Sequence, residues 1–485
     1  AADGSPKRGG TLRIGTAGAS TTQSLDPVTW DDAFPYVLSH QIFNCLVEID
    51  ADSRPQPELA ESWEGSDGAS VWRFRLRRGV TFHDGRTMTA ADVVWSLDYH
   101  RGPDSKSPAR SLLAPVVEMR AEDDHTIVIR LRDGNADFPH LLSDDHLAVF
   151  PADTSDWSRV PGTGGYVLQS YEPGVRALAT RNPNYWKSGR AHFDAIETVG
   201  INDVVARTTA LQTGEVDVIN RCELRTVDRL AGTPGIDIVE VTGTRHNTAP
   251  MRCDTAPFDS LDVRLALKYG LDRQRILDTV LRGHGVLGND HPIAPGQRYH
   301  AADLPQRGYD PDRARFHLKQ AGMDRLKLPL STSDAAFAGA VDAAVLYQEF
   351  AAKAGIDIEL VREPSDGYWS NVWLKRPWCM AYWSGRPTAD WMFTQAYAAD
   401  AKWNDSHWSH ARFNELLVAA RTETEDSRRG AMYAEMQSLV RDDGGVVVMA
   451  FANDVHAATT KLAYGALAAN REFDGARIAE RWWFA

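Results

Sequence analysis

"VTFHDGRTMTAADVVWSL", residues 80–97, joins the end of a predicted strand to the start of a predicted helix. Gly85 follows a His-Asp pair and supplies a tight turn, because glycine tolerates the positive φ that such turns require. Thr89 is a favourable N-cap, and Asp92 stands three residues later, where a carboxylate faces the amides of the first helical turn. Apolar residues then recur at helical spacing. The stretch therefore predicts a strand-to-helix corner followed by a capped helix.

The pair His83–Asp84 at this corner has two interpretations, a catalytic pair or a scaffold. The preceding residues 71–79, "VWRFRLRRG", alternate apolar side chains with arginines, which is the pattern of a half-buried strand. A general base needs a nucleophile or a polarised water within reach. No Ser or Cys in a strained elbow stands nearby in the sequence. We therefore expect His83 and Asp84 to be part of the architecture.

Length and composition restrict the class of protein. A chain of 485 residues is too long for one ordinary core, and about two or three compact units are expected. The net charge of −13 argues against binding to nucleic acid or to anionic lipid, both of which favour a basic surface. No apolar run approaches the ~20 residues of a membrane span. The 15 tryptophans favour a protein with an aromatic-walled binding cleft, although many of them must also pack the core.

The N-terminus and the cysteines bear on the compartment. The first ten residues, "AADGSPKRGG", are small and polar, as expected just after cleavage of a signal peptide. Cysteines 45, 222, 253 and 379 lack the CxxC spacing of a zinc ribbon or a thioredoxin-like motif. In an oxidising compartment they form up to two disulfides, or they remain four buried thiols. The sequence leaves both alternatives open.

Several further segments have clear patterns. Residues 9–18 predict a strand, 37–49 a helix and an edge strand, and 161–174 ("PGTGGYVLQSYEPG") a Gly-rich loop leading into a strand. The strand at 326–333, the helix from about 334 to 354 and the strand at 356–363 form a parallel strand–helix–strand unit. These patterns predict an α/β fold. We also expect helices at 205–211, 311–321, 411–421 and 425–441.

Five motifs in this order resemble the extracytoplasmic solute-binding proteins of ABC transporters, in the dipeptide/oligopeptide/nickel-binding family (family 5). The motifs are "LAESWEGSDGASVWRFRLRRGVTFHDGRTMTAADVVWSL" at 59–97, "PGTGGYVLQSYEPG" at 161–174, "RNPNYW" at 181–186, "LQTGEVDVI" at 211–219 and "APFDSLDVRLALKYGLDRQRIL" at 256–277. The resemblance spans essentially the whole chain. It implies a periplasmic-binding-protein type II-like fold, with two α/β lobes, a hinge and an extra β-rich domain. It also implies that the corner at His83 and Asp84 is scaffold.

The resemblance further implies a division into three domains that close over a solute. Domain I is discontinuous, domain II is the extra domain, and domain III carries most of the C-terminal half. The expected segments are 1–43 (domain I), 44–159 (domain II), 160–247 (domain I), 248–454 (domain III) and 455–485 (domain I).

An enzyme is the alternative from another class, and a secreted hydrolase is its most concrete form. The sequence contains no G-x-S-x-G elbow, no H-E-x-x-H motif and no P-loop. His407 and His410 have a spacing that suits one helical face, so a nickel-chelate or metal receptor of the same family is a second alternative. The segment "WNDSHWSHARF" reads better as a loop entering a helix, and two histidines alone make a weak metal site. We expect no catalytic activity, no metal and no cofactor.

The ligand is the open question, and residues 378–393, "WCMAYWSGRPTADWMF", bear on it. The peptide binders of the family hold the ligand's α-amine with an aspartate in this segment. In an ungapped alignment that position falls at Gly385, with Arg386 beside it. Asp390 takes that position only if a small gap is placed in the alignment. Arg386 offers a permanently charged fork suited to a carboxylate, sulfonate or phosphate. The alternative for Arg386 is a salt bridge to Asp390.

Other candidate ligand-binding residues come from three segments. Four aromatic residues near Arg386 are available to wall a pocket, namely Tyr382, Trp383, Trp391 and Trp403, of which Trp383 and Trp403 are preferred. His246 and Asn247 fall where the family's hinge strand passes the cleft. Thr22 and Gln23 belong to the loop "ASTTQSLDP" at 19–27, which is either a ligand loop or an ordinary surface loop.

Together these observations predict the solute-binding component of an ABC importer. We expect it to capture a small polar solute in an interdomain cleft, either peptide-like or acid-bearing, such as an oligopeptide, an opine or an amino-acid derivative. The expected partners are this solute and the membrane subunits of an ABC permease, and the protein is expected to be a monomer. We expect a periplasmic location after removal of a signal peptide, with a lipid-anchored form as the alternative.

Overall fold

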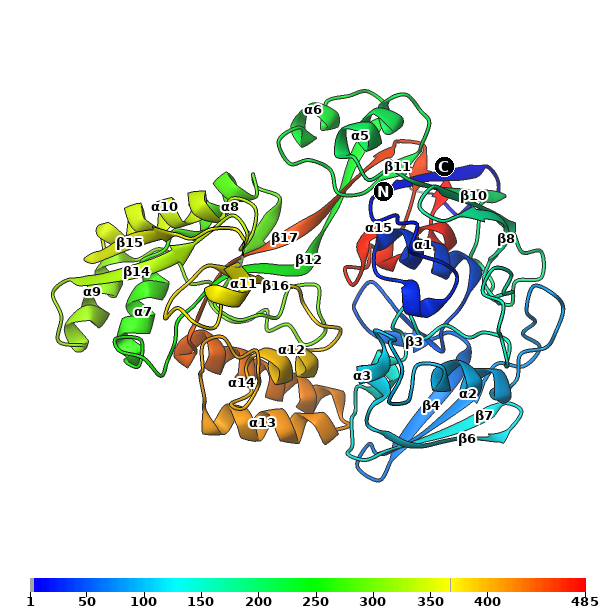
Figure 1. Ribbon diagram of the computed structural model, residues 1–485, viewed down its shortest axis with the longest axis horizontal. Coiled ribbons are helices and arrows are strands. Elements are labelled where there is room, and N and C mark those ends of the chain that lie inside the picture. Colours follow the sequence, from blue (N-terminus) through cyan, green and yellow to red (C-terminus); the bar gives the residue numbers. More distant parts are fainter. Residues whose placement is uncertain (1–3, 367) are drawn as a thin grey trace. The chain divides into compact units, whose positions relative to one another are not determined.

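The computed structural model describes residues 4–366 and 368–485, which form two compact units. Unit 1 comprises residues up to Val241 together with Asp454–Ala485, and unit 2 comprises Thr242–Asn453. The chain passes between the units inside two long strands, β12 (Ile236–Pro250) and β17 (Val446–Thr459) (Figure 1). Both strands are uninterrupted at the crossing points, so each unit is joined to the other by regular structure rather than by a loose linker.

Unit 1 contains two main sheets. β1 lies between β10 and β11 and runs parallel to both, while β9 and β8 continue the sheet in antiparallel fashion. A second, antiparallel sheet has the order β4-β5-β7-β6, and α2 packs against β6 and β7. The strands are β1 (Thr11–Thr16), β2 (Val47–Ile49), β3 (Pro55–Pro57), β4 (Ala60–Ser66), β5 (Val71–Leu76), β6 (Val116–Asp123), β7 (Thr126–Leu131), β8 (Tyr166–Glu172), β9 (Arg176–Arg181), β10 (Ala195–Gly200), β11 (Val218–Ile219), β18 (Leu462–Ala463) and β19 (Trp483–Phe484). The helices are η1 (Pro27–Thr29), α1 (Ala33–Ile42), α2 (Ala90–Asp98), α3 (Arg110–Leu113), α4 (Phe138–Leu141), α5 (Val204–Gln212), α6 (Val227–Ala231), α15 (Glu472–Gly475) and α16 (Ile478–Arg481).

Unit 2 is a second α/β body. The predicted strand–helix–strand unit is present: β14 and β15 are parallel neighbours and α10 packs on both. A separate sheet portion pairs β16 with β12 and β13 with β17. The strands are β13 (Gly285–Leu287), β14 (Leu326–Thr332), β15 (Ile356–Arg362) and β16 (Ala381–Trp383). The helices are α7 (Leu261–Tyr269), α8 (Arg273–Val280), α9 (Pro311–Gln320), α10 (Ala340–Ala352), α11 (Tyr368–Asn371), α12 (Ala389–Ala396), α13 (Ala411–Thr422) and α14 (Asp426–Asp443).

The corner at residues 80–97 has the predicted form. Trp72, Phe74 and Leu76 of β5 are buried while the intervening arginines are not. Gly85 has a φ of +92°, as a tight turn requires. Thr89 is the N-cap of α2, and its backbone N–H donates to the Asp92 carboxylate at 2.8 Å.

His83 and Asp84 act separately at this corner. The His83 Nε2–H donates to the carbonyl oxygen of Gly164 at 2.9 Å, and burial lowers the pKa of the imidazole. Asp84 instead accepts a hydrogen bond from the Arg86 guanidinium at 2.8 Å. The two side chains therefore connect the turn to neighbouring backbone and to a nearby side chain, as a scaffold does.

Several boundaries differ from the sequence prediction. The long helix expected from about 334 begins only at Ala340, because Gly339 precedes it with a φ of +84°. The helix expected from about 37 begins earlier, at Ala33, where the Asp32 side chain accepts a hydrogen bond from the Ala33 amide. The division of the chain into three domains at 43, 159, 247 and 454 stays a prediction.

Unit 1 contains a buried set of charges that we call the Glu58 network. Arg477 donates to both carboxylate oxygens of Glu58, at 2.6 and 3.0 Å. Lys187 bridges Glu480 at 2.6 Å and Glu48 at 2.9 Å. Burial by itself raises the pKa of Glu58, but Arg477 and Lys187 outweigh it and bring the pKa down to about 2. The members of the network are Glu48, Glu58, Lys187, Arg190, Arg477, Glu480 and Arg481.

The four cysteines are free thiols in this structure, and three of them, Cys45, Cys222 and Cys379, are buried. Cys253 is partly exposed. Burial raises the pKa of each of the four thiols, which keeps them in the neutral, unreactive form. The structure thus has no disulfide among these four cysteines, and it differs from the alternative of four buried thiols at Cys253. In the described part of the chain, no helix is long and apolar enough to cross a membrane.

Candidate functional site

The strongest candidate site lies in unit 2, around the last residue of β16. We call it the Trp383 cluster, and its members are His246, Trp373, Trp383, Arg386, Trp403 and Asp405. β16 is antiparallel to β12, and their register pairs Trp383 with His246 and Tyr382 with Asn247. The sheet thus brings together two segments that are more than a hundred residues apart in the sequence.

Three indoles form the apolar part of the cluster. The ring centroids of Trp373 and Trp383 are 6.0 Å apart, and those of Trp383 and Trp403 are 6.4 Å apart. Trp383 is only 7% exposed, whereas Trp403 is 39% exposed. The cluster therefore has a buried inner ring and an outer ring that faces solvent, which suits a wall for a flat or apolar part of a ligand.

Arg386 provides a positive charge beside this wall. Its guanidinium carbon lies 5.5 Å from the centroid of the Trp383 ring, a cation–π distance. The guanidinium donates to the Ser384 carbonyl oxygen at 2.8 Å and to the Gln395 side chain. Among the residues that the structure describes, no carboxylate forms an ion pair with Arg386. Burial lowers the pKa of the Arg386 guanidinium.

Asp390 does not form the salt bridge with Arg386 that was the alternative for that arginine. Asp390 sits in the first turn of α12 and accepts hydrogen bonds from the Arg421 guanidinium, with its ion pair at 3.0 Å. It also accepts a hydrogen bond from the Thr394 hydroxyl at 3.1 Å. Its carboxylate is thus already occupied by a cation of α13, which argues against its binding a ligand amine.

Gly385 stands where the ungapped alignment places the amine-binding aspartate of the peptide binders. A Cβ atom added there would lie 2.1 Å from the Cβ of Thr244, and the Gly385 amide donates to the Thr244 hydroxyl at 3.1 Å. Glycine permits this close approach of β12, and an aspartate would not fit without moving the backbone. In this chain, position 385 therefore has no room for an aspartate side chain.

Asp405 is a member that the sequence analysis missed. One carboxylate oxygen, Oδ2, accepts hydrogen bonds from the indole N–H groups of Trp373 at 3.0 Å and of Trp383 at 3.1 Å. Burial raises the pKa of this carboxyl to about 6. In the described chain no cation pairs with it. The segment "KWNDSH" around Asp405 contains no motif that predicts its burial or its hydrogen bonds to the two indoles, because these contacts depend on the tertiary fold.

His246, Asn247 and Tyr382 border the cluster. His246 is fully buried, and its Nδ1–H donates to the Thr244 carbonyl oxygen at 2.9 Å. Burial and, secondarily, the charge of Arg386 lower the pKa of His246 to about 4, so the ring is neutral at pH 7. Asn247 is buried as well, while the Tyr382 ring lies 4.8 Å from the Arg245 guanidinium. Six of the sequence-predicted residues of unit 2 thus lie around β16, namely His246, Asn247, Tyr382, Trp383, Arg386 and Trp403, whereas Trp391 lies in α12.

Thr22 and Gln23 belong to unit 1. The Gln23 side chain is buried and donates to the Gly18 carbonyl oxygen at 3.0 Å and to Asp31 at 2.8 Å. Thr22 is exposed and its hydroxyl lies 2.8 Å from that of Ser20. Gln23 therefore stabilises its own loop, and Thr22 remains a surface residue of that loop.

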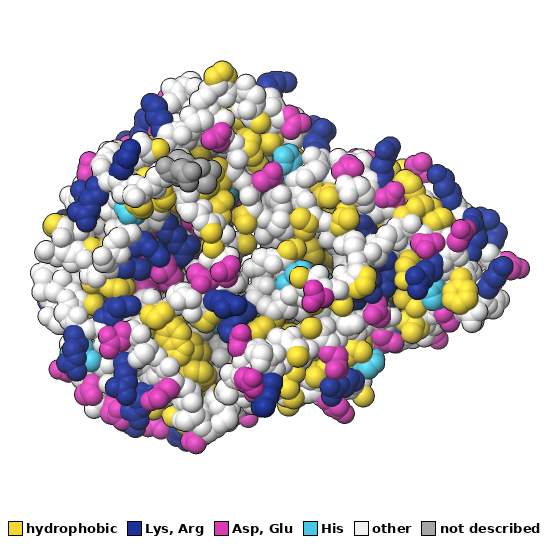
Figure 2. Space-filling view, turned by 180° about the vertical axis from the view of Figure 1, so that it is seen from behind, with side chains coloured by type: hydrophobic (Ala, Val, Ile, Leu, Met, Phe, Trp, Pro, Cys, Tyr) yellow, Lys and Arg dark blue, Asp and Glu magenta, His cyan; other side chains and the backbone are white. Residues whose placement is uncertain are grey.

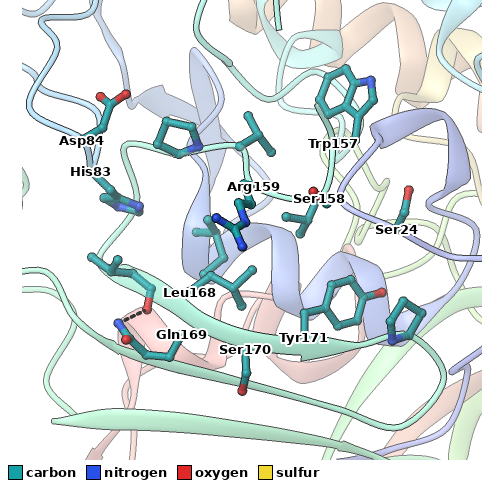
Figure 3. A pocket seen from close by; sticks show the side chains of 16 residues that line it. Ser24, His83, Asp84, Trp157, Ser158, Arg159, Leu168, Gln169, Ser170 and Tyr171 are labelled. Carbon is teal, nitrogen blue, oxygen red and sulfur yellow. Dashed lines mark hydrogen bonds between the residues drawn. The ribbon is translucent and has the colours of Figure 1, made fainter. Parts of the chain in front are cut away.

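Unit 1 has a pocket of about 860 Å³ that offers a second candidate (Figure 3). It is lined by Trp157, Arg159 and Tyr171, and the corner residues His83 and Asp84 reach its edge. Arg159 is exposed and so remains hydrated, unlike Arg386. The pocket thus has room for a small molecule but lacks a desolvated, unpaired charge that would call for one.

In the described part of the chain, no three His, Cys, Asp or Glu side chains are arranged to hold a metal ion. His407 lies before α13 with a φ of +53°, and His410 is the N-cap of that helix. The two histidines therefore do not share a helical face.

On the side of the molecule shown in Figure 2, basic and acidic side chains are interspersed.

Comparison with known proteins places the chain in a family. The family of bacterial extracellular solute-binding proteins, family 5 Middle, matches residues 54–405. The heme-binding protein A of Haemophilus influenzae is 30% identical to this chain. The matched region covers 59% of this chain and 57% of that relative. The periplasmic oligopeptide-binding protein OppA of Escherichia coli is 24% identical over 88% of this chain and 85% of its own.

A solved structure has the same fold. HbpA2 from Haemophilus parasuis superposes with a TM-score of 0.86 at 22% identity, over 96% of this chain and 99% of that one. These relatives are binding proteins rather than enzymes. The chain therefore belongs to family 5 of the bacterial extracellular solute-binding proteins.

Proposed function

We propose that the protein binds one small polar solute that carries an acid group, and that Arg386 is the residue that binds this acid. The observation that supports the proposal is the half-buried guanidinium of Arg386, which has no carboxylate partner in the described chain. A desolvated charge is costly unless an opposite charge compensates it. A planar guanidinium is also suited to hold a carboxylate, sulfonate or phosphate through two parallel hydrogen bonds.

The Trp383 cluster adds a second requirement on the solute. Its outer indole, Trp403, presents a flat apolar surface beside Trp383, the ring over which Arg386 lies. A solute with an acid group and an apolar or unsaturated portion satisfies both features. An opine-like conjugate, a modified peptide or an amino-acid derivative belongs to this class. The names of the relatives show that family members bind ligands as different as heme and oligopeptides.

The protein delivers this solute to the membrane subunits of an ABC permease and catalyses no reaction. It acts as a monomer in the periplasm after removal of a signal peptide, in keeping with a relative that is named periplasmic. Mass spectrometry of the native N-terminus tests the location, and a diacylglyceryl-cysteine there would contradict a freely diffusing periplasmic form.

The test of the acid-binding role is a pair of variants and a pair of ligands. Native mass spectrometry of the purified protein identifies a co-purified solute, and calorimetry then compares its acid form with its neutral amide. Hydrogen bonds to a charged group contribute about 1.5–3 kcal/mol each. Arg386→Ala should therefore weaken the acid form at least about tenfold and the amide much less.

Arg412→Ala is the matched control, because Arg412 is an exposed arginine paired with Glu435 in the same unit. It should leave the affinity for both forms unchanged. Equal weakening of the acid and the amide by Arg386→Ala, or no weakening of either, would contradict the proposal.

A further inference from the structure

We propose that the unit 1 pocket is a second binding site, separate from the one at Arg386, and that it takes a small amphipathic acid. The acid group of this ligand lies at Arg159, and its apolar or aromatic body lies against Trp157, Leu168 and Tyr171 (Figure 3). The inference does not rest on the proposed function, because every residue that lines the pocket belongs to unit 1, whereas Arg386 belongs to unit 2.

The first argument is the size and the chemistry of the pocket. Its volume of about 860 Å³ lies within the range of sites that hold small ligands, roughly 300–1,000 Å³. More than half of the lining residues are apolar or aromatic, and most come from the loop at 157–161 and from β8, the terminal strand of its sheet. A pocket of this kind suits a molecule with a substantial hydrocarbon or aromatic part.

The second argument is that the core holds the aromatic walls in place. Trp157 packs edge-on against Phe150, with ring centroids 5.0 Å apart and an interplanar angle of 88°, and its ring lies 5.1 Å from that of Tyr99. Tyr171 is stacked on Phe34 with ring centroids 6.1 Å apart. Walls that are ordered before binding lose little conformational freedom when a ligand arrives, which favours affinity.

The third argument is the positive charge that faces this wall. Figure 3 shows the Arg159 side chain directed from its loop toward Leu168 of β8. In the part of the chain that the structure describes, no carboxylate forms an ion pair with this guanidinium. Asp156, the nearest acid in the sequence, instead accepts hydrogen bonds from the Ser158 amide at 3.0 Å and from the Ser158 hydroxyl at 2.5 Å. The planar Arg159 guanidinium is therefore available to hold a carboxylate.

The other polar groups of the pocket do not compete for this charge. Among the described residues that line it, Asp84 is the one acid, and its carboxylate accepts a hydrogen bond from Arg86 at 2.8 Å. Figure 3 shows the Asp84 carboxylate pointing away from Arg159. His83 donates to the Gly164 carbonyl oxygen at 2.9 Å, and burial lowers the pKa of its imidazole, so the ring is neutral at pH 7. The pocket therefore favours a ligand with a single negative charge.

The exposure of Arg159 determines how strongly this charge contributes. The guanidinium stays hydrated when the pocket is empty, so the ligand-free protein carries no penalty for it. For the same reason the ion pair adds little, because pairs between exposed charges typically contribute about two- to fivefold in affinity. We expect the apolar walls to supply most of the binding and Arg159 to select the acid.

The test uses indole-3-acetate as the probe and indole-3-acetamide as its neutral counterpart. Both are titrated by calorimetry into the Arg386→Ala variant, so that the other proposed acid-binding residue is absent. We expect one indole-3-acetate to bind per chain, about two- to fivefold more tightly than the amide.

Three further substitutions in this background assign the two parts of the pocket. Arg159→Gln should abolish the preference for the acid and leave the affinity for the amide unchanged. Leu168→Gln should weaken the acid and the amide alike, because it replaces an apolar wall residue. Arg225→Gln is the matched control, since Arg225 is also an exposed arginine of unit 1 but does not line the pocket, and it should change neither affinity.

Two results would overturn the inference. One is that Arg386→Ala binds no indole-3-acetate at millimolar concentration, and the other is that the preference for the acid persists in Arg159→Gln. Neither result bears on the proposed function, because that function is tested at Arg386 with the protein's own solute.

Discussion

The Glu58 network of unit 1 and the Trp383 cluster of unit 2 both place charges in the interior, but they treat them in opposite ways. In the network, Glu58 accepts two hydrogen bonds from Arg477, and Lys187 bridges neighbouring acids. In the cluster, Arg386 has no acid and Asp405 has no cation among the described residues. The charges of the network are thus compensated within the protein and stabilise the fold, whereas those of the cluster are available to an external partner.

This comparison has a thermodynamic consequence. A compensated buried pair is strongly destabilised when one member is removed, because the other is left as an unpaired buried charge. An uncompensated charge destabilises the ligand-free protein already, and its removal relieves that cost. Substitutions in the two regions should therefore change stability in opposite directions.

The largest effect is expected from Arg477→Met, which leaves Glu58 and Glu480 without this cation. Breaking a buried pair in this way typically costs about 3–5 kcal/mol. We expect a loss of that size in the free energy of unfolding, measured by denaturant titration. Arg412→Met removes one partner of an exposed pair with Glu435 and should cost less than about 1 kcal/mol. Equal costs for the two variants would show that the network is not compensated as described.

The next effect has the opposite sign and concerns Asp405→Asn. The folded pKa of about 6 lies above the ordinary value of 3.8, so the folded protein binds the extra proton more tightly. The stabilisation that protonation of Asp405 provides is therefore fully present below about pH 4 and is lost as the pH rises through about 6. Each pKa unit of difference between the folded and unfolded protein corresponds to about 1.36 kcal/mol. Asp405→Asn should therefore stabilise the ligand-free protein by up to about 3 kcal/mol at pH 7.5.

The pH profile of this variant checks the cause. The gain in unfolding free energy should disappear below about pH 4, where Asp405 is protonated in both states. Denaturant titrations of both proteins from pH 4 to 7.5 provide the measurement. A loss of stability at pH 7.5 would mean that the carboxylate is compensated after all.

A smaller loss is expected from Gly385→Ala, because the new methyl group meets Thr244 of β12. Overpacking of this kind typically costs about 1–3 kcal/mol. Gly308→Ala is the control, since a Cβ atom there has no neighbour within 4 Å and no unusual φ stands against it. Thermal unfolding of the two variants should differ clearly. If Gly385→Ala is as stable as Gly308→Ala, the absence of an aspartate at this position has another cause.

The smallest effect belongs to the corner where the sequence analysis began. His83→Ala removes one hydrogen bond to Gly164 and should cost about 0.5–2 kcal/mol of stability. It should leave solute affinity unchanged, because His83 serves the architecture of unit 1. A hundredfold loss of affinity with normal melting would reveal a binding residue instead of a scaffold.

Local pattern was sufficient to predict much of the fold. The alternation of Trp72, Phe74 and Leu76 gave β5, and the Thr89–Asp92 spacing gave the start of α2, because both features depend on neighbours in the sequence. The same reasoning placed α10 too early, since only the tertiary structure reveals the left-handed Gly339. Helix and strand types were thus more predictable than their ends.

The candidate site was less predictable, for the same physical reason. Arg386, Trp383 and Trp403 were candidates because they lie in or near the segment that the family resemblance links to ligand binding, and the structure connects them through Trp383. The partner of Asp390 proved to be Arg421, because α13 packs against α12. Asp405 carries no sequence signal, since its burial and its indole donors come from segments that only folding unites. Charge compensation is a property of the fold, and a linear motif does not show it.

The most direct test of this account is a crystal structure of the protein bound to the solute that native mass spectrometry detects. The account predicts acid oxygens of the solute within hydrogen-bonding distance of the Arg386 guanidinium, with the rest of the molecule against Trp383 and Trp403. A solute bound instead in the unit 1 pocket beside Trp157 and Arg159, or one that leaves Arg386 without an anion, would contradict it.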